Sequence, residues 1–167
     1  MLVTFTRTGS RRYRISVEGP SIDPLWMEPA PGFDELLPHD MAHFVVENHL
    51  GLTGGVFGQL ASGGTANTFH PADSTGKRKA VRRGKQISAA NREDAVLSEK
   101  AVAEAWAKWK GAKRVSSGET VLSEAEIDAI CSAFDSVSSR WSRLGVGDSM
   151  RLEWQGERVK GPRRQNR

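Results

Sequence analysis

The chain has 167 residues, 38% of them hydrophobic and 26% charged, and its formal net charge is +4. This length and composition are typical of one soluble domain with a core of its own, here over residues 1–167. No apolar run approaches the roughly 20 residues of a membrane-spanning helix, the N-terminus lacks a signal-peptide core, and a lone Cys131 excludes an internal disulfide framework. We therefore expect a cytoplasmic protein that does not cross a membrane.

The N-terminus predicts a β-hairpin. Residues 2–7 (LVTFTR) and 12–18 (RYRISVE) both alternate apolar and polar side chains, and a short turn around Gly9 separates them. The segment 24–28 (PLWME) predicts a further short strand. The face of the hairpin that is expected to enter the core carries Val3, Phe5, Tyr13, Ile15 and Val17.

A helix is predicted from about Pro38 to Asn48. Pro38 suits the first helical position, where its missing N–H is no loss, and Gly51 suits the exit from the helix. Wound at 100° per residue, this helix is apolar over most of its circumference. The remaining arc carries a narrow stripe of titratable side chains: His39, Asp40, His43 and Glu47.

The stripe predicts a site for a divalent metal ion, with zinc the metal that suits it most. His39 and His43 are an i,i+4 pair, about 6 Å apart along the helix axis, which lets two imidazoles share one ion. We expect Asp40 to orient these ligands or to handle protons and Glu47 to line the site, and a hydrolytic reaction would fit these roles. A third ligand has to come from elsewhere, and the sequence offers His70, Asp73, Asp34 and Glu28.

A third histidine, His49, makes this stretch look like the zinc-protease pattern H-E-x-x-H-x-x-G-x-x-H. In that pattern a glutamate follows the first histidine and a glycine turn carries the third ligand round, whereas Asp40 and Val46 take these places here. On an unbroken helix His49 would lie about 15 Å along the axis from His39, too far to share an ion. The sequence therefore excludes a protease of this class.

Other interpretations of the stripe stay open. Both histidines could hydrogen-bond to carbonyl groups of the sheet or of a loop and have only a structural role. His43 could instead move protons with Asp40 or Glu47 in a metal-free acid–base site. The stripe could also pack against another subunit, which would make the protein an adaptor.

The next part of the chain is rich in glycine and then basic. Residues 56–61 (VFGQLA) predict a short helix, and the glycines of TGGVFG are expected to permit a tight turn and close packing, since no phosphate-loop ending G-K-[ST] follows. Residues 65–90 have no convincing periodicity. We therefore expect them to form a flexible basic segment.

This basic segment supports an alternative function, as a nucleic-acid-binding or protein-interaction module. Blocks of positive charge can contact phosphate backbones, although solvated linkers and tails are their commoner use. A basic tail over 156–167, expected to be disordered, adds further charge. The residues expected to make such contacts are Lys77, Arg78, Lys79, Arg82, Arg83 and Lys85.

The C-terminal part predicts two helices and a returning strand. Residues 91–110 are good helix formers, and a second helix begins after Ser123, which forms a capping box with Glu126. This helix ends near Gly145, and residues 149–154 (SMRLEW) alternate as a strand does. The order of elements predicts an α+β fold, in which a small antiparallel sheet (the N-terminal hairpin plus the C-terminal strand) is covered by three to four helices.

At the level of family, residues 31–64 (PGFDELLPHDMAHFVVENHLGLTGGVFGQLASGG) resemble an uncharacterised set of small bacterial proteins. These proteins pair an L-P-H-D-x-x-H-F-V-V-E helix with a G-x-F-G-Q-L-A segment. Their C-terminal part, a helix ending near R-W and a strand of the S-L-T-L-E-W type, is similar to residues 139–141 and 149–154. The resemblance skips the basic middle of the chain, and it implies a shared fold without an established activity.

Overall fold

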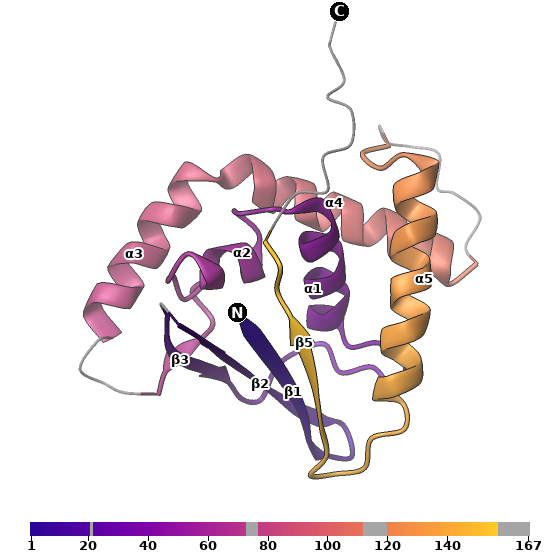
Figure 1. The fold of residues 1–167 in the computed structure, drawn as a ribbon, viewed down its shortest axis with the longest axis horizontal. Coiled ribbons are helices and arrows are strands. Elements are labelled where there is room, and N and C mark those ends of the chain that lie inside the picture. Colours follow the sequence, from indigo (N-terminus) through magenta and orange to yellow (C-terminus); the bar gives the residue numbers. More distant parts are fainter. Residues whose placement is uncertain (21, 73–76, 112–119, 157–167) are drawn as a thin grey trace, which may run out of the picture.

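The computed structural model describes residues 1–20, 22–72, 77–111 and 120–156. Their strands form one five-stranded antiparallel sheet in the order β4-β3-β2-β1-β5 (Figure 1). The strands are β1 (Leu2–Gly9), β2 (Arg12–Gly19), β3 (Ile22–Met27), β4 (His70–Pro71) and β5 (Ser149–Glu153).

Strands β1 and β2 are the predicted hairpin. Val3 pairs with Val17 and Phe5 with Ile15, and these side chains are buried because they lie on the same face of the pleated pair. Tyr13, the fifth residue assigned to that face, is also fully buried. The predicted returning strand is β5, which pairs with β1 and completes the sheet on that side.

Three helices cover this face of the sheet: α1 (His39–Leu50), α2 (Val56–Ala61) and α5 (Glu124–Trp141). Aromatic rings form the contacts. The ring of Phe5 lies 6.3 Å from Phe44 of α1 and 6.4 Å from Phe57 of α2, and Tyr13 lies 5.9 Å from Trp141 of α5. These contacts confirm the α+β class and place the core between the sheet and the helices.

Helix α4 (Arg92–Trp109) does not lie on the sheet but packs against α1 and α5 (Figure 1). Its Trp106 and Trp109 rings pack against Phe134 of α5. Helix α1 is therefore enclosed on two sides: Phe44 contacts the sheet, and His43 contacts α4. This enclosure explains why seven consecutive residues of α1, 41–47, are buried.

Helix α3 (Lys77–Ala90) occupies the second half of the segment for which no regular element was predicted. Its Gly84 approaches the backbone of the α2–β4 connection so closely that an added Cβ would stand 3.1 Å from the nitrogen of Thr65. The sequence has no convincing periodicity here, so the regular helix over residues 77–90 was not predicted. That this segment is flexible stays a prediction, and the basic tail from residue 157 lies outside the described residues.

Among the described residues, each helix is either too short or too polar to span a bilayer.

Candidate metal centre on α1 and α4

The loop before α1 sets the position of His39. Asp34 turns the chain by accepting hydrogen bonds from the backbone N–H groups of Leu36 and Leu37, at 2.8 and 2.9 Å. The backbone N–H of His39 then donates to the carbonyl of Gly32, which has the left-handed φ of +67°. This turn brings the chain back beside the first residue of α1 and leaves the His39 side chain exposed. The Asp34 carboxylate is therefore engaged in the loop that leads into α1.

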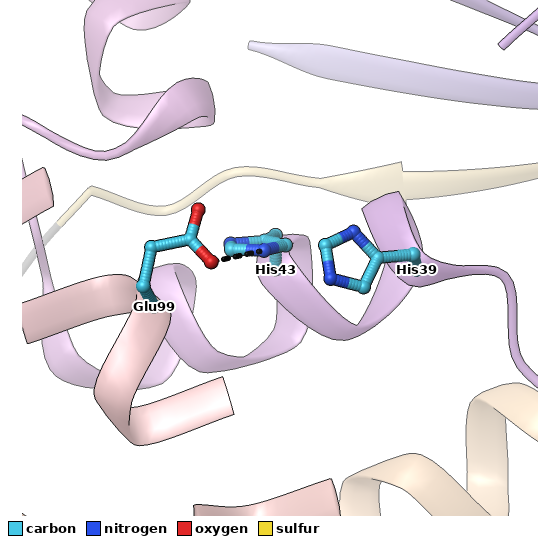
Figure 2. Close-up of side chains that lie close together, drawn as sticks. All are labelled: His39, His43 and Glu99. Atoms are coloured by element: carbon cyan, nitrogen blue, oxygen red, sulfur yellow. Dashed lines mark ion pairs between the residues drawn. The ribbon is translucent and has the colours of Figure 1, made fainter. Parts of the chain in front are cut away.

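His39, His43 and Glu99 form a cluster that could hold a metal ion (Figure 2). One ligand atom of each lies within 4.8 Å of those of the other two. The two imidazole rings are 4.6 Å apart, and His43 Nε2 lies 3.7 Å from a carboxylate oxygen of Glu99. His43 is buried, with an exposed fraction of 3%, whereas His39 and Glu99 are exposed.

Glu99 is the third member of the cluster, and the sequence analysis did not identify it. It comes from α4, 56 positions after His43, and no local pattern in REDAVLSEKAV marks it as a ligand. Of the four alternatives offered by the sequence, His70 pairs with Trp26 in the sheet and Asp73 lies outside the described residues. The remaining two, Asp34 and Glu28, do not belong to the cluster.

The other ring nitrogen of His43 faces inward, toward two buried side chains. Nδ1 lies 3.0 Å from the hydroxyl of Ser98 and 3.5 Å from a carboxylate oxygen of Glu47. Burial alone would lower the pKa of His43, but the close contact with the Glu47 carboxylate and the negative charges of Glu47, Glu99 and Asp40 raise it above its ordinary value. The protonated imidazole is thus favoured relative to a solvent-exposed histidine.

Glu47 is fully buried and joins α1 to α2. Its two carboxylate oxygens accept hydrogen bonds from the backbone N–H groups of Val56 and Phe57, at 2.9 and 2.8 Å. These are the first two residues of α2, so the carboxylate satisfies donors that a helix N-terminus leaves without partners. The structure therefore places Glu47 behind His43, away from the exposed side of the cluster, and a catalytic role for it stays a prediction.

Asp40 turns toward the sheet rather than toward α4. Its carboxylate and the carbonyl of Pro31 both lie at hydrogen-bonding distance from the hydroxyl of Tyr13 on β2. Burial raises the pKa of Asp40, while the hydrogen bond from Tyr13 and the nearby His39 and His43 lower it, and the net shift is upward. The predicted stripe is thus divided, because His43 and Glu47 face α4 and Asp40 faces β2.

The chemical types of the three donors suit zinc, but the distances between their ligand atoms are wider than in a zinc site. Two imidazoles and one carboxylate are a ligand set of catalytic zinc sites, which leave a fourth position open. Ligand atoms around tetrahedral zinc stand ~3.3 Å apart, so a cluster spread over 4.8 Å would have to contract. His39 and Glu99 are exposed and free to adjust, whereas His43 is enclosed.

The basic residues expected to contact nucleic acid lie on a different part of the molecule. Arg78, Arg82 and Lys85 of α3 are exposed and follow an i, i+4, i+7 spacing, which places them on one face of the helix. Arg83 is also exposed, but its guanidinium lies beside Gly63, in the connection between α2 and β4. The side chains of Lys77 and Lys79 are outside the described part of the chain.

Comparisons with protein-family models, with curated protein sequences and with solved structures find no match for this chain. The resemblance to a set of small bacterial proteins therefore stays a prediction.

Proposed function

We propose that His39, His43 and Glu99 bind a divalent cation, with zinc the most suitable, and that the site is hydrolytic. The observation that supports this proposal most is the convergence of the three side chains from two separate helices. With three protein ligands, a fourth position stays open for water or substrate. A bound zinc ion would supply a water with a pKa lowered to about 7, which is the usual nucleophile of metal-assisted hydrolysis.

Each residue has a distinct part in this proposal. His43 is the fixed ligand, because it is enclosed between α1 and α4. His39 and Glu99 close on the ion from the exposed side. Asp40 lies close enough to both histidines for their charges to affect its pKa, and we assign to it the handling of protons at the edge of the site.

Metal titration of untagged protein tests the cation site. We expect one equivalent of zinc or cobalt to bind to the wild type, and Glu99→Gln and the double variant His39→Ala plus His43→Ala to bind much more weakly. Glu93→Gln is the matched control, since Glu93 is also exposed on α4 but lies outside the cluster. Equal binding by the wild type and the double variant would contradict the site.

Hydrolysis is tested separately from binding. Model carboxylic esters and phosphate esters would be offered to the zinc-loaded wild type and to zinc-loaded Asp40→Asn, the variant that lacks the group to which we assign the handling of protons. We expect turnover by the wild type that disappears on addition of a chelator. Stoichiometric zinc without any such turnover would leave the cation site standing and contradict the hydrolytic assignment.

The second proposed function is binding of nucleic acid by α3. The fourteen residues of this helix contain no Asp or Glu. On a helical wheel, Gly84, which docks on the α2–β4 connection, stands roughly 100–160° away from the exposed stripe of Arg78, Arg82 and Lys85. The stripe therefore points away from the domain, and this orientation favours contact with a partner.

Salt dependence distinguishes phosphate contacts from other kinds of binding. We expect the affinity for labelled duplex DNA to fall with added salt, with a slope of roughly −0.9 per phosphate contacted. The triple variant Arg78→Gln, Arg82→Gln and Lys85→Gln should bind more weakly, and the magnitude of its salt slope should be smaller by about 3. Unchanged affinity in that variant would contradict the proposal.

A cytoplasmic location, favoured by the lone Cys131, belongs to both proposed functions.

A further inference from the structure

His43, Ser98 and Glu47 form a buried chain of hydrogen bonds that runs from α1 to α4 and back. The Ser98 hydroxyl lies 3.0 Å from His43 Nδ1 and donates to Glu47 Oε1 at 2.8 Å. The exposed fractions of the three residues are 3%, 2% and 0%, so no bulk water competes for these bonds.

The direction of this chain follows from counting protons. A carboxylate only accepts hydrogen bonds, and Glu47 already accepts from the backbone N–H groups of Val56 and Phe57. Ser98 has a single hydroxyl proton, and the bond to Glu47 uses it. The contact between Ser98 and His43 therefore requires a proton on Nδ1 of the imidazole. In the neutral ring, the lone pair is then on Nε2.

We propose that Ser98 and Glu47 are positioning residues for His43, which hold its proton on Nδ1 and present the Nε2 lone pair to the space between His39 and Glu99. Nε2 is the atom that lies 3.7 Å from the Glu99 carboxylate. A metal-binding histidine usually donates its other N–H in this way, which fixes the ring and its tautomer. The part of the inference that concerns metal affinity rests on the proposed cation site, whereas the part that concerns the tautomer does not.

The structure also explains why this chain can hold the ring in place. Glu47 cannot turn away without leaving two amide N–H groups of α2 without partners, which is costly in a buried position. Ser98 lies in α4, next to Glu99, so one helix supplies both the group that orients His43 and the carboxylate opposite Nε2. The buried contact thereby fixes the side of the cluster from which the other ligands approach.

The test uses Ser98→Ala, with Ser98→Thr as the conservative variant and Ser138→Ala as the control. Ser138 is also buried but lies on α5 and does not belong to the hydrogen-bonded chain or to the cluster. Long-range proton–nitrogen NMR of the metal-free protein, at a pH where the ring is neutral, reports which nitrogen of His43 carries the proton. We expect Nδ1–H in the wild type, in Ser98→Thr and in Ser138→Ala, and loss of that preference in Ser98→Ala.

Zinc affinity, measured by competition with a chromophoric chelator, is the second readout. We expect Ser98→Ala to weaken binding roughly 10–100-fold and Ser98→Thr to restore it. An Nε2–H tautomer in the wild type overturns the inference, and this spectrum decides the matter even if Ser98→Ala fails to fold. If the wild type and Ser98→Ala bind zinc equally well and have the same His43 tautomer, the positioning role is overturned and the cation site is left standing. No zinc binding, together with the expected tautomers, supports the positioning role and contradicts only the cation site.

Discussion

Gly55 lies directly against the carboxylate of Glu47. A Cβ added at this glycine would stand 2.3 Å from Glu47 Cδ and 2.4 Å from its Oε1, far inside van der Waals contact. The glycine-rich turn before α2 and the buried acid on α1 therefore depend on each other. Because Glu47 also holds Ser98, the turn is connected to the histidine cluster.

Gly55→Ala is expected to lower the free energy of unfolding by about 1–3 kcal/mol, the usual result of forcing extra atoms into a packed site. The added methyl group would push the carboxylate away from the amides of α2. Urea unfolding measures the change. Gly9→Ala is the control, since its nearest contact would be an ordinary 3.4 Å, and a change within roughly 0.5 kcal/mol is expected there. Equal losses in the two variants would contradict the explanation.

Two carboxylates near His43 are expected to have unequal effects on stability when they become amides. Glu47→Gln places an N–H donor where backbone or serine donors need an acceptor, so we expect a loss of about 1–3 kcal/mol in the free energy of unfolding. Glu99→Gln changes a side chain that is 70% exposed, and its stability should stay within roughly 0.5 kcal/mol of the wild type.

The same two variants are then compared for zinc affinity. Glu99→Gln should lose most of its binding although it remains stable, because it lacks a proposed ligand. Unfolding curves and zinc titrations on the same preparations provide both values. If Glu47→Gln kept its stability and Glu99→Gln lost it, both assignments would be contradicted: Glu47 as the buried acceptor and Glu99 as the exposed ligand.

Much of the fold could be predicted because its signals are local. The alternation in β1 and β2 marks the buried face, and the capping box of Ser123 and Glu126 marks the start of α5. Helix α3 has no such signal, since Val81 and Ile87 are its only large apolar residues and do not form a stripe. It docks through Gly84 instead, where the absence of a side chain permits the contact, and a hydrophobic pattern cannot reveal this.

The candidate site could be predicted only in part. The spacing of His39 and His43 on one helix gives the pair its geometry, and this is visible in the sequence. Ser98 and Glu99 approach because α4 packs on α1, which depends on the whole fold. Glu47 lies on the same stripe as His43, as the helical wheel indicates, but the wheel does not reveal that its carboxylate is buried against the first residues of α2.

Asp40→Asn is expected to change the pH dependence of stability. The pKa of Asp40 is raised above its ordinary 3.8, mainly by burial, so the folded state binds this proton more tightly than the unfolded state does. Its contribution is fully present below the ordinary value and is lost as the pH rises through the raised pKa. Asparagine does not titrate there. The stability of the variant relative to the wild type should therefore increase between roughly pH 4 and pH 7.

Urea unfolding at the two pH values, with a chelator present, measures this change. Asp128→Asn, which alters an exposed carboxylate on α5, is the control, and its stability relative to the wild type should stay nearly constant. A constant difference for Asp40→Asn as well would mean that its carboxylate titrates alike in the folded and unfolded protein.

The two histidines are expected to contribute unequally to zinc affinity. His43 is enclosed and held at Nδ1, so it requires little ordering on binding, whereas the exposed His39 must lose side-chain freedom. His43→Ala should therefore weaken zinc binding more than His39→Ala does. The loss of zinc affinity in His43→Ala should also exceed the roughly 10–100-fold loss expected when an orienting partner such as Ser98 is removed.

The pH dependence of zinc binding should identify His43 as this principal ligand. A histidine binds metal only as the neutral imidazole, so affinity falls as the pH drops below its pKa. Because the neighbouring carboxylates raise the pKa of His43 in spite of its burial, the fall should begin at a higher pH than for an ordinary histidine. Glu99→Gln removes one of those negative charges, and in this variant the remaining binding should begin to fall at a lower pH than in the wild type. A profile that does not move in Glu99→Gln would place the principal ligand elsewhere, because Glu99 acts on His43 at 3.7 Å.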